Sequence, residues 1–219
     1  MQAPAPLSPP PLPSLRAQAL HALALTDPTG KVAATHALFE AWEAGRVLLD
    51  PAEQLTPLPQ QPLPGRPAQP VLMPPKEVPQ RSPFTPPGLA MLLHAVTHIE
   101  FNAINLALDA VWRFHGMPPD FYSDWLRVAD EEATHFCLLH AHLLHLGYQY
   151  GDFPAHDGLW EMCVKTQHDA ARRAAGFSQA ELDDLLSAQN IDLAIRYGPL
   201  SSGDQATVLF QDEFIAVAD

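Results

Sequence analysis

The sequence is poor in cysteine. Only two are present in 219 residues, Cys137 and Cys163, and each lies inside an apolar run with helical character. A secreted domain held by disulfides needs a denser cysteine framework, so this class is excluded. The pattern predicts two buried free thiols in a reducing compartment, which favours a cytoplasmic location.

Basic side chains and long apolar runs are also scarce. Lys and Arg number 12 against 25 Asp and Glu, giving a formal net charge of −13. A phosphate backbone is bound by clustered cationic groups, so we expect no nucleic-acid partner. The N-terminus lacks the basic and apolar regions of a signal peptide, and no window approaches 18 consecutive apolar residues. We therefore expect no membrane partner.

Proline is abundant but unevenly placed. Of 24 prolines, 20 precede residue 88, which marks a boundary in the chain. Repeated X-Pro pairs exclude regular helix and remove donors from a sheet, which favours a strap over the next domain, with a free linker as the alternative. The predicted divisions are a disordered tail (1–13), short helices (14–50), a strap (51–88), a helical core (89–176) and a divergent end (177–219).

Two short helices are expected before the strap. Ser14 is placed to cap the first of them. In the second, Leu38 and Trp42, followed by Val47, can face a core.

Two longer helices are predicted in the core, from Gly88 to Arg113 and from Ser123 or Asp124 to Leu146. A third, from Leu159 to Ala175, is expected after a loop. Each of the first two has an apolar stripe at steps of three and four that includes a carboxylate. The stripes are Val96, Glu100, Ile104, Ala107 and Val111 in the first, and Val128, Glu132, His135, Leu139 and Leu143 in the second.

An ionised carboxylate in an apolar stripe is costly unless it is paired or binds a cation. If the two helices are antiparallel neighbours, Glu100 converges on Glu132 and His135, which share a face at i and i+3. These donors make half of a carboxylate-bridged dimetal site. The alternative is that the Glu-x-x-His is only the solvated side of an ordinary helix.

A family resemblance rests on long motifs. The run "HAVTHIEFNAINLALDAVWRFHGMP" and the later "DEEATHF" and "HDGLWE" segments resemble the bacterial ferritin-like family called domain of unknown function 455, over about residues 15 to 175. The resemblance implies an all-α, ferritin-like four-helix bundle with a di-iron centre, manganese being the alternative metal. It also implies that Glu100, Glu132 and His135 are ligands. It implies no particular reaction.

The end of the chain departs from that family. Glu181 and Glu213 repeat the 32-residue separation of Glu100 and Glu132, which makes them candidate ligands of the second half-site. Position 216, however, is Ala where the family has His. The alternative is that an unrelated segment replaces the last helices, because "IDLAIRYGPLSSGD" and "LFQDEFIAVAD" are similar to part of the effector domain of LysR-type regulators and favour strands.

His94 and His98 form a separate i, i+4 pair. Position 98 lies about 160° around the helix from Glu100, so the pair is expected to pack in the core or at the surface and not to join the same centre.

Two function classes remain. The first is a non-haem di-iron or manganese oxidoreductase acting on dioxygen or an unknown small molecule, with a homo-oligomer compatible with this interpretation. The second is a non-catalytic helical scaffold, or a damaged copy, with a partial or empty metal site. No catalytic residues are assigned beyond the metal ligands.

Overall fold

The computed structural model describes residues 13–57, 59–79 and 81–170, together with three strands near the end of the chain. Residues 13–170 are helical apart from their connections, as predicted. The elements are α1 (Leu15–Ala24), α2 (Pro28–Glu43), the 3-10 helix η1 (Pro75–Glu77), α3 (Pro86–Arg113), α4 (Pro119–His145) and α5 (Gly158–Lys165).

The strands form a small antiparallel sheet in the order β1-β3-β2. They are β1 (Leu193–Tyr197), β2 (Ala206–Thr207) and β3 (Phe214–Ala218). Of the two interpretations of the tail, the strand conformation is therefore the one that its described pieces adopt. Position 216 lies inside β3, where it pairs with Ile195.

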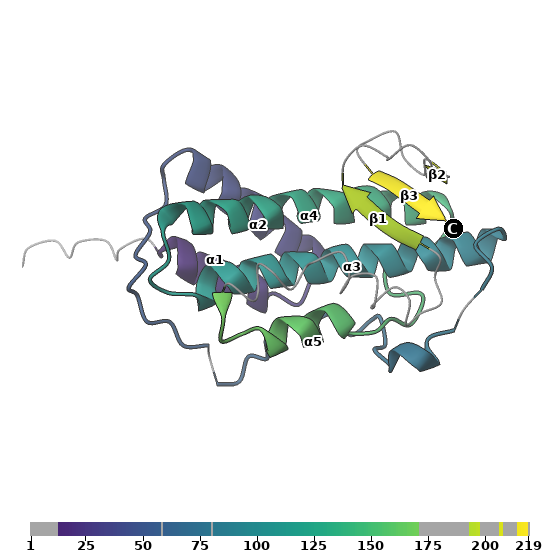
Figure 1. Ribbon diagram of the computed structural model, residues 1–219, viewed down its shortest axis with the longest axis horizontal. Helices are drawn as coiled ribbons and strands as arrows, with labels where there is room; N and C mark the ends of the chain where they lie inside the picture. Colours follow the sequence, from purple (N-terminus) through teal and green to yellow (C-terminus); the bar gives the residue numbers. More distant parts are fainter. Residues whose placement is uncertain are drawn as a thin grey trace, which may run out of the picture.

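A long antiparallel hairpin of α3 and α4 forms the centre of the molecule (Figure 1). The turn between them contains Gly116, which has a φ of 72°. Glycine adopts this left-handed conformation without strain because it has no Cβ. Helix α4 begins at Pro119, earlier than the predicted Ser123 or Asp124. Proline has no backbone N–H that would need an acceptor at the first helical position, and its ring fixes φ near the helical value. The helix can therefore begin there without a capping side chain.

The two N-terminal helices pack on this hairpin, α1 on α3 and α2 on α4 (Figure 1). Ser14 caps α1 as predicted, accepting a hydrogen bond from the N–H of Ala17 at 3.1 Å. Leu38 and Val47 are buried, also as predicted. Trp42 is partly buried and donates its indole N–H to Ser123 of α4 at 3.1 Å, which ties α2 to the hairpin.

The proline-rich segment is held against the helices. The N–H of Gly65 donates to the carbonyl of Leu23 at 2.9 Å, and a Cβ at position 65 would lie 2.2 Å from the carbonyl oxygen of Ala24. Farther on, Met73 donates to the carbonyl of Ala155 at 2.9 Å. Along the part that the structure describes, this segment therefore lies on the core instead of hanging free.

Two predictions about the core are wrong. Cys163 is buried, but Cys137 is exposed, because it lies on the side of α4 turned away from α3. The helix predicted from Leu159 to Ala175 is interrupted: α5 ends at Lys165 and residues 166–169 are not helical. Residue 170 is helical again, and 171–175 lie outside the described residues.

No described helix is both long enough and apolar enough to cross a membrane.

Candidate metal centre

A buried carboxylate lies in the middle of α3. Thr85 caps this helix by accepting from the N–H of Gly88 at 3.3 Å, and the apolar stripe that follows turns toward α4. Ile104 is fully buried on that stripe, and Glu100, one turn earlier, is only 2% exposed. The helical period that buries the apolar residues thus also carries this carboxylate into the core.

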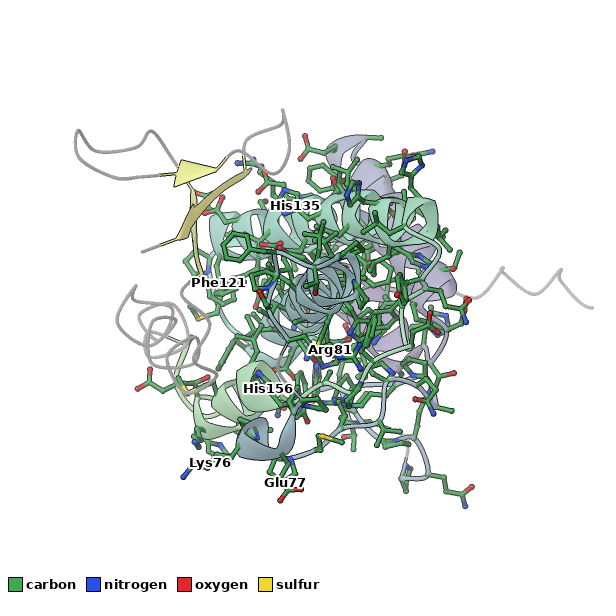
Figure 2. All side chains as sticks on the ribbon, turned by 90° about the vertical axis from the view of Figure 1, so that its right-hand side faces the viewer. Lys76, Glu77, Arg81, Phe121, His135 and His156 are labelled. Atoms are coloured by element: carbon green, nitrogen blue, oxygen red, sulfur yellow. The ribbon has the colours of Figure 1, made fainter. Side chains whose placement is uncertain are left out.

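The facing helix supplies the Glu-x-x-His. Glu132 and His135 are one turn apart on α4, and the Nδ1 of His135 lies 3.0 Å from an Oε of Glu132. The two side chains are 13% and 18% exposed, so they lie at the edge of the interface between α3 and α4. In Figure 2, His135 is on the α4 side of the molecule.

The three predicted ligands meet. One donor atom from each of Glu100, Glu132 and His135 can be chosen so that all three lie within 4.8 Å of one another. Among the described residues, no other set of His, Cys, Asp or Glu forms such a group. The other two predicted ligands, Glu181 and Glu213, lie outside the described residues.

The electrostatics of this group favour a cation. Burial, reinforced by the neighbouring carboxylate of Glu132, raises the pKa of Glu100 well above its ordinary value. Two carboxylates in a poorly solvated site cannot both ionise cheaply unless positive charge is present. A bound divalent ion supplies that charge, so the side chains present fit a metal.

The donors in this group are oxygen and nitrogen. Two carboxylates and one imidazole, with no thiolate, suit several divalent ions and do not select one of them.

The other side of α3 carries a second polar cluster, which is separate from the metal group. His94 and His98 are both buried, as the core alternative predicted. The N–H of Gly151 donates to Nε2 of His94 at 2.9 Å, and His98 is bonded to Tyr150 and to the carbonyl of His156. In Figure 2, His156 lies beside α5, on the side of the molecule away from His135.

His98 has three hydrogen-bonding partners. Its Nε2 lies 3.1 Å from the carbonyl oxygen of His156 and 3.0 Å from the side-chain amide of Asn102. Its Nδ1 lies 2.8 Å from the hydroxyl of Tyr150. Burial lowers the pKa of His98 to about 3, which keeps the ring neutral.

Most of this cluster could not be predicted from the sequence. The sequence shows only that His94, His98 and Asn102 follow one another at steps of four, which places three polar side chains on one face of α3. Tyr150 and the ion pair of Arg66 with Asp157, at 2.7 Å, come from loops whose placement no periodicity predicts.

A buried lysine was missed as well. Lys31 on α2 is 0% exposed and donates to the carbonyls of Leu23 and Gly65 at 3.0 and 2.8 Å and to the side chain of Asn105. Its ammonium also lies 4.9 Å from the centre of the Phe101 ring, next to Glu100 in the chain. Lys31 therefore joins α1, α2 and the strap to the part of α3 that carries Glu100.

Comparison with known proteins gives the family. The model of the family "Protein of unknown function (DUF455)" matches residues 24–185. The chain belongs to the DUF455 family. This DUF455 chain is also 54% identical over 125 residues to an uncharacterized protein of Haemophilus influenzae. The matched region is 54% of this chain and 43% of that relative, so the chain spans less than half of the relative's length. No solved structure matches.

Proposed function

We propose that this DUF455 chain is a ferritin-like metal-binding protein whose Glu100, Glu132 and His135 bind iron or manganese. The observation that supports this most directly is the convergence of three donor atoms within 4.8 Å around a carboxylate that is 2% exposed. A buried carboxylate that stays ionised without a cation would destabilise the fold, and a bound metal ion removes that cost.

The proposed activity is that of a non-haem iron or manganese oxidoreductase. A bound ferrous ion would supply one-electron chemistry and an open position for dioxygen or a small molecule. The protein's part is to hold the ion in a largely dry site. Glu100 supplies a buried carboxylate from α3. On α4, Glu132 and His135 orient one another through their 3.0 Å contact, and each can turn a donor atom to the same point.

The alternative is a non-catalytic helical scaffold. It is favoured by the small number of imidazoles, since the described donor group contains only His135, and by Ala216, which lies in a strand. Metal uptake together with oxygen consumption separates the two functions, because a scaffold can keep a partial or empty metal site but does not consume dioxygen. No nucleic-acid partner is proposed in either case, given the net charge of −13.

The test is metal loading of the purified full chain under anaerobic conditions with Fe(II) or Mn(II). We expect about one tightly bound ion per chain by elemental analysis and calorimetry. Glu132→Ala should abolish uptake and leave the helical circular dichroism unchanged. Glu131→Ala is the matched control, because Glu131 is the adjacent carboxylate on α4 but is exposed.

Two results would refute the proposal: a wild-type chain that stays metal-free after loading, or a Glu132→Ala variant that still binds the ion as wild type does. If the ion binds, oxygen consumption by the Fe(II)-loaded protein then tests the oxidoreductase activity. A metal-loaded protein that consumes no oxygen above the rate of free Fe(II) would favour the scaffold.

A further inference from the structure

We propose that the tip of the loop between α4 and α5 (residues 149–153) is an acid-released cover of the helical core, held closed by the neutral imidazole of His94. The decisive contact is one hydrogen bond. The backbone N–H of Gly151 donates to Nε2 of His94 at 2.9 Å. A backbone N–H can only donate, so Nε2 must carry no proton while the loop tip is closed.

The closed site has no place for a second proton on this ring. Because Nε2 accepts, the proton of the neutral ring is on Nδ1, which has no hydrogen-bond partner among the described residues. The ring is 0% exposed, so water does not solvate it. A second proton would go to Nε2, where it would point at the N–H of Gly151. Protonation of His94 and closure of the loop tip therefore oppose each other.

The loop tip rests on α3 mainly through this histidine. The ring of Tyr150 is stacked on His94, and the ring of Phe153 meets it edge-on, both at 5.5 Å between ring centres. The other hydrogen bond from the loop tip to α3 joins the hydroxyl of Tyr150 to Nδ1 of His98 at 2.8 Å. One imidazole thus holds the loop tip by two aromatic contacts and one backbone bond.

The two ends of the loop are anchored in other ways. Before the loop tip, the N–H of Tyr148 donates to the carbonyl of Leu143 at 2.9 Å. After it, Ala155 donates to the carbonyl of Val71 at 3.0 Å and accepts from the N–H of Met73 at 2.9 Å. These are backbone bonds without a titratable group. The loop tip can therefore leave α3 while the ends of the loop and the strap stay in place.

The closed loop tip covers an aromatic pair between the two long helices. The ring centre of Tyr150 lies 5.6 Å from that of Phe101 on α3 and 5.2 Å from that of Phe136 on α4. Both phenylalanines are only 2% exposed. Release of the loop tip would admit water to this pair without separating α3 from α4.

The groups that face His94 leave its response to acid intact. Among the described residues, Asp152 of the loop tip is the one charged group that shifts the pKa of His94 appreciably; it raises this pKa, but burial outweighs it and lowers the pKa to about 4. On α3, burial lowers the pKa of His98 to about 3, helped by the charge of Arg66 on the strap, so His98 stays neutral. The tyrosines of the loop are uncharged phenols in acid, and α4 presents leucines to this part of α3.

The size of the response follows from the two states of the ring. An exposed His94 has a pKa of 6.5, against about 4 in the closed form. Below pH 6.5 the open form takes up a proton that the closed form does not, so the equilibrium constant for opening rises as the pH falls, by about twentyfold from pH 7 to pH 5. Above pH 7 the contribution of this ring is flat.

The experiment is amide hydrogen exchange of the full chain without added metal, followed by NMR at pH 7 and pH 5 and corrected for the intrinsic exchange rates. In wild type, the protection factor of the Gly151 N–H should fall by about twentyfold. In His94→Gln it should stay constant, because the amide oxygen can still accept the bond but does not titrate. His145→Gln, at an exposed position on α4, is the control and should respond as wild type does. Circular dichroism checks that both variants fold.

Low concentrations of urea separate local release from global unfolding. A local opening exposes little surface, so the exchange of Gly151 should not change with urea. The N–H of Ile104, in the buried centre of α3, should exchange faster as urea is added, because it exchanges through a larger opening. If both amides responded to urea alike, the loop tip would open only with the whole fold, and the proposal would be wrong.

Two other results would overturn the proposal. One is an equal fall in the protection of Gly151 in wild type and in His94→Gln. The other is seen in wild type alone, and so does not require the variant to fold: the nitrogen chemical shifts of the His94 ring at pH 7 should place the proton on Nδ1, and a proton on Nε2 would contradict the closed geometry. None of these measurements depends on metal uptake, so failure of the proposed function would be recognised separately.

Discussion

Replacement of the buried lysine tests the electrostatics of the helical core. In Lys31→Met the side-chain volume is nearly kept, but the charge and the donors are lost. The carbonyls of Leu23 and Gly65 and the side chain of Asn105 then lack their partner. An unsatisfied buried acceptor costs about 1–3 kcal/mol, and this loss is opposed by relief from desolvation of the amine. That relief shrinks as the pH rises toward 10.5, so the variant should lose stability relative to wild type as the pH rises.

The pH dependence gives the sharper test. Burial, reinforced by the positive charge of Arg66, lowers the pKa of Lys31 from 10.5 to about 7. Between these values the unfolded chain keeps a proton that the folded chain has released, so the free energy of unfolding rises with pH. Worked from the two values, the rise from pH 7 to pH 9 is about 2 kcal/mol, and below pH 7 the contribution is nearly flat.

The assay is urea unfolding of the metal-free protein, followed by far-ultraviolet circular dichroism at several pH values from 6 to 9. The difference between wild type and Lys31→Met removes the contribution of other titrating groups. Lys76→Met is the control, because Lys76 is exposed on η1 and should leave the slope unchanged. Parallel profiles for wild type and Lys31→Met between pH 7 and pH 9 would refute the reasoning.

Two further predictions concern the core around α3. Burial lowers the pKa of His94 to about 4 and that of His98 to about 3, so both remain neutral in the folded chain while the unfolded chain takes up protons below pH 6.5. The free energy of unfolding should therefore fall by about 2 kcal/mol for each histidine between pH 7 and pH 5. Denaturant titrations should show a smaller fall for His98→Gln. The control variant His145→Gln, at an exposed position, should show the same fall as wild type. Gly65→Ala should lower the thermal midpoint far more than Gly45→Ala. The Cβ at position 65 would meet the carbonyl oxygen of Ala24, whereas at position 45 nothing lies within 4 Å and the φ of 64° is the one cost. Equal midpoints for the two glycine variants would show that the strap does not lie where the structure has it.

The candidate metal group could be predicted from the sequence because helical periodicity is local. Steps of three and four placed Glu100 on the buried stripe of α3, and the i, i+3 spacing placed Glu132 and His135 together on α4. What the sequence could not supply was the distance between the helices. The 4.8 Å convergence depends on the antiparallel register of the hairpin, which packing along both helices decides.

Boundaries were predicted less well than elements. The start of α4 was placed at a capping side chain, but Pro119 begins the helix without one. Cys137 was assigned to the core from its apolar neighbours, yet its direction on the helix turns it outward. In both cases the helix itself was predicted correctly. The prediction failed on one geometric property, which is the fixed φ of proline for the start of α4 and the direction of the side chain around the helix for Cys137.

The sequence by itself determined the helices, the break in composition near residue 88 and the three donors, because each depends on the order of neighbouring residues. Tertiary structure alone decided which groups from distant segments meet. The bonds of Lys31 to Gly65 and to Asn105, and the bond between His98 and Tyr150, join residues separated by tens of positions. No local period encodes such contacts, since they arise only when whole elements pack and buried polar groups must find partners.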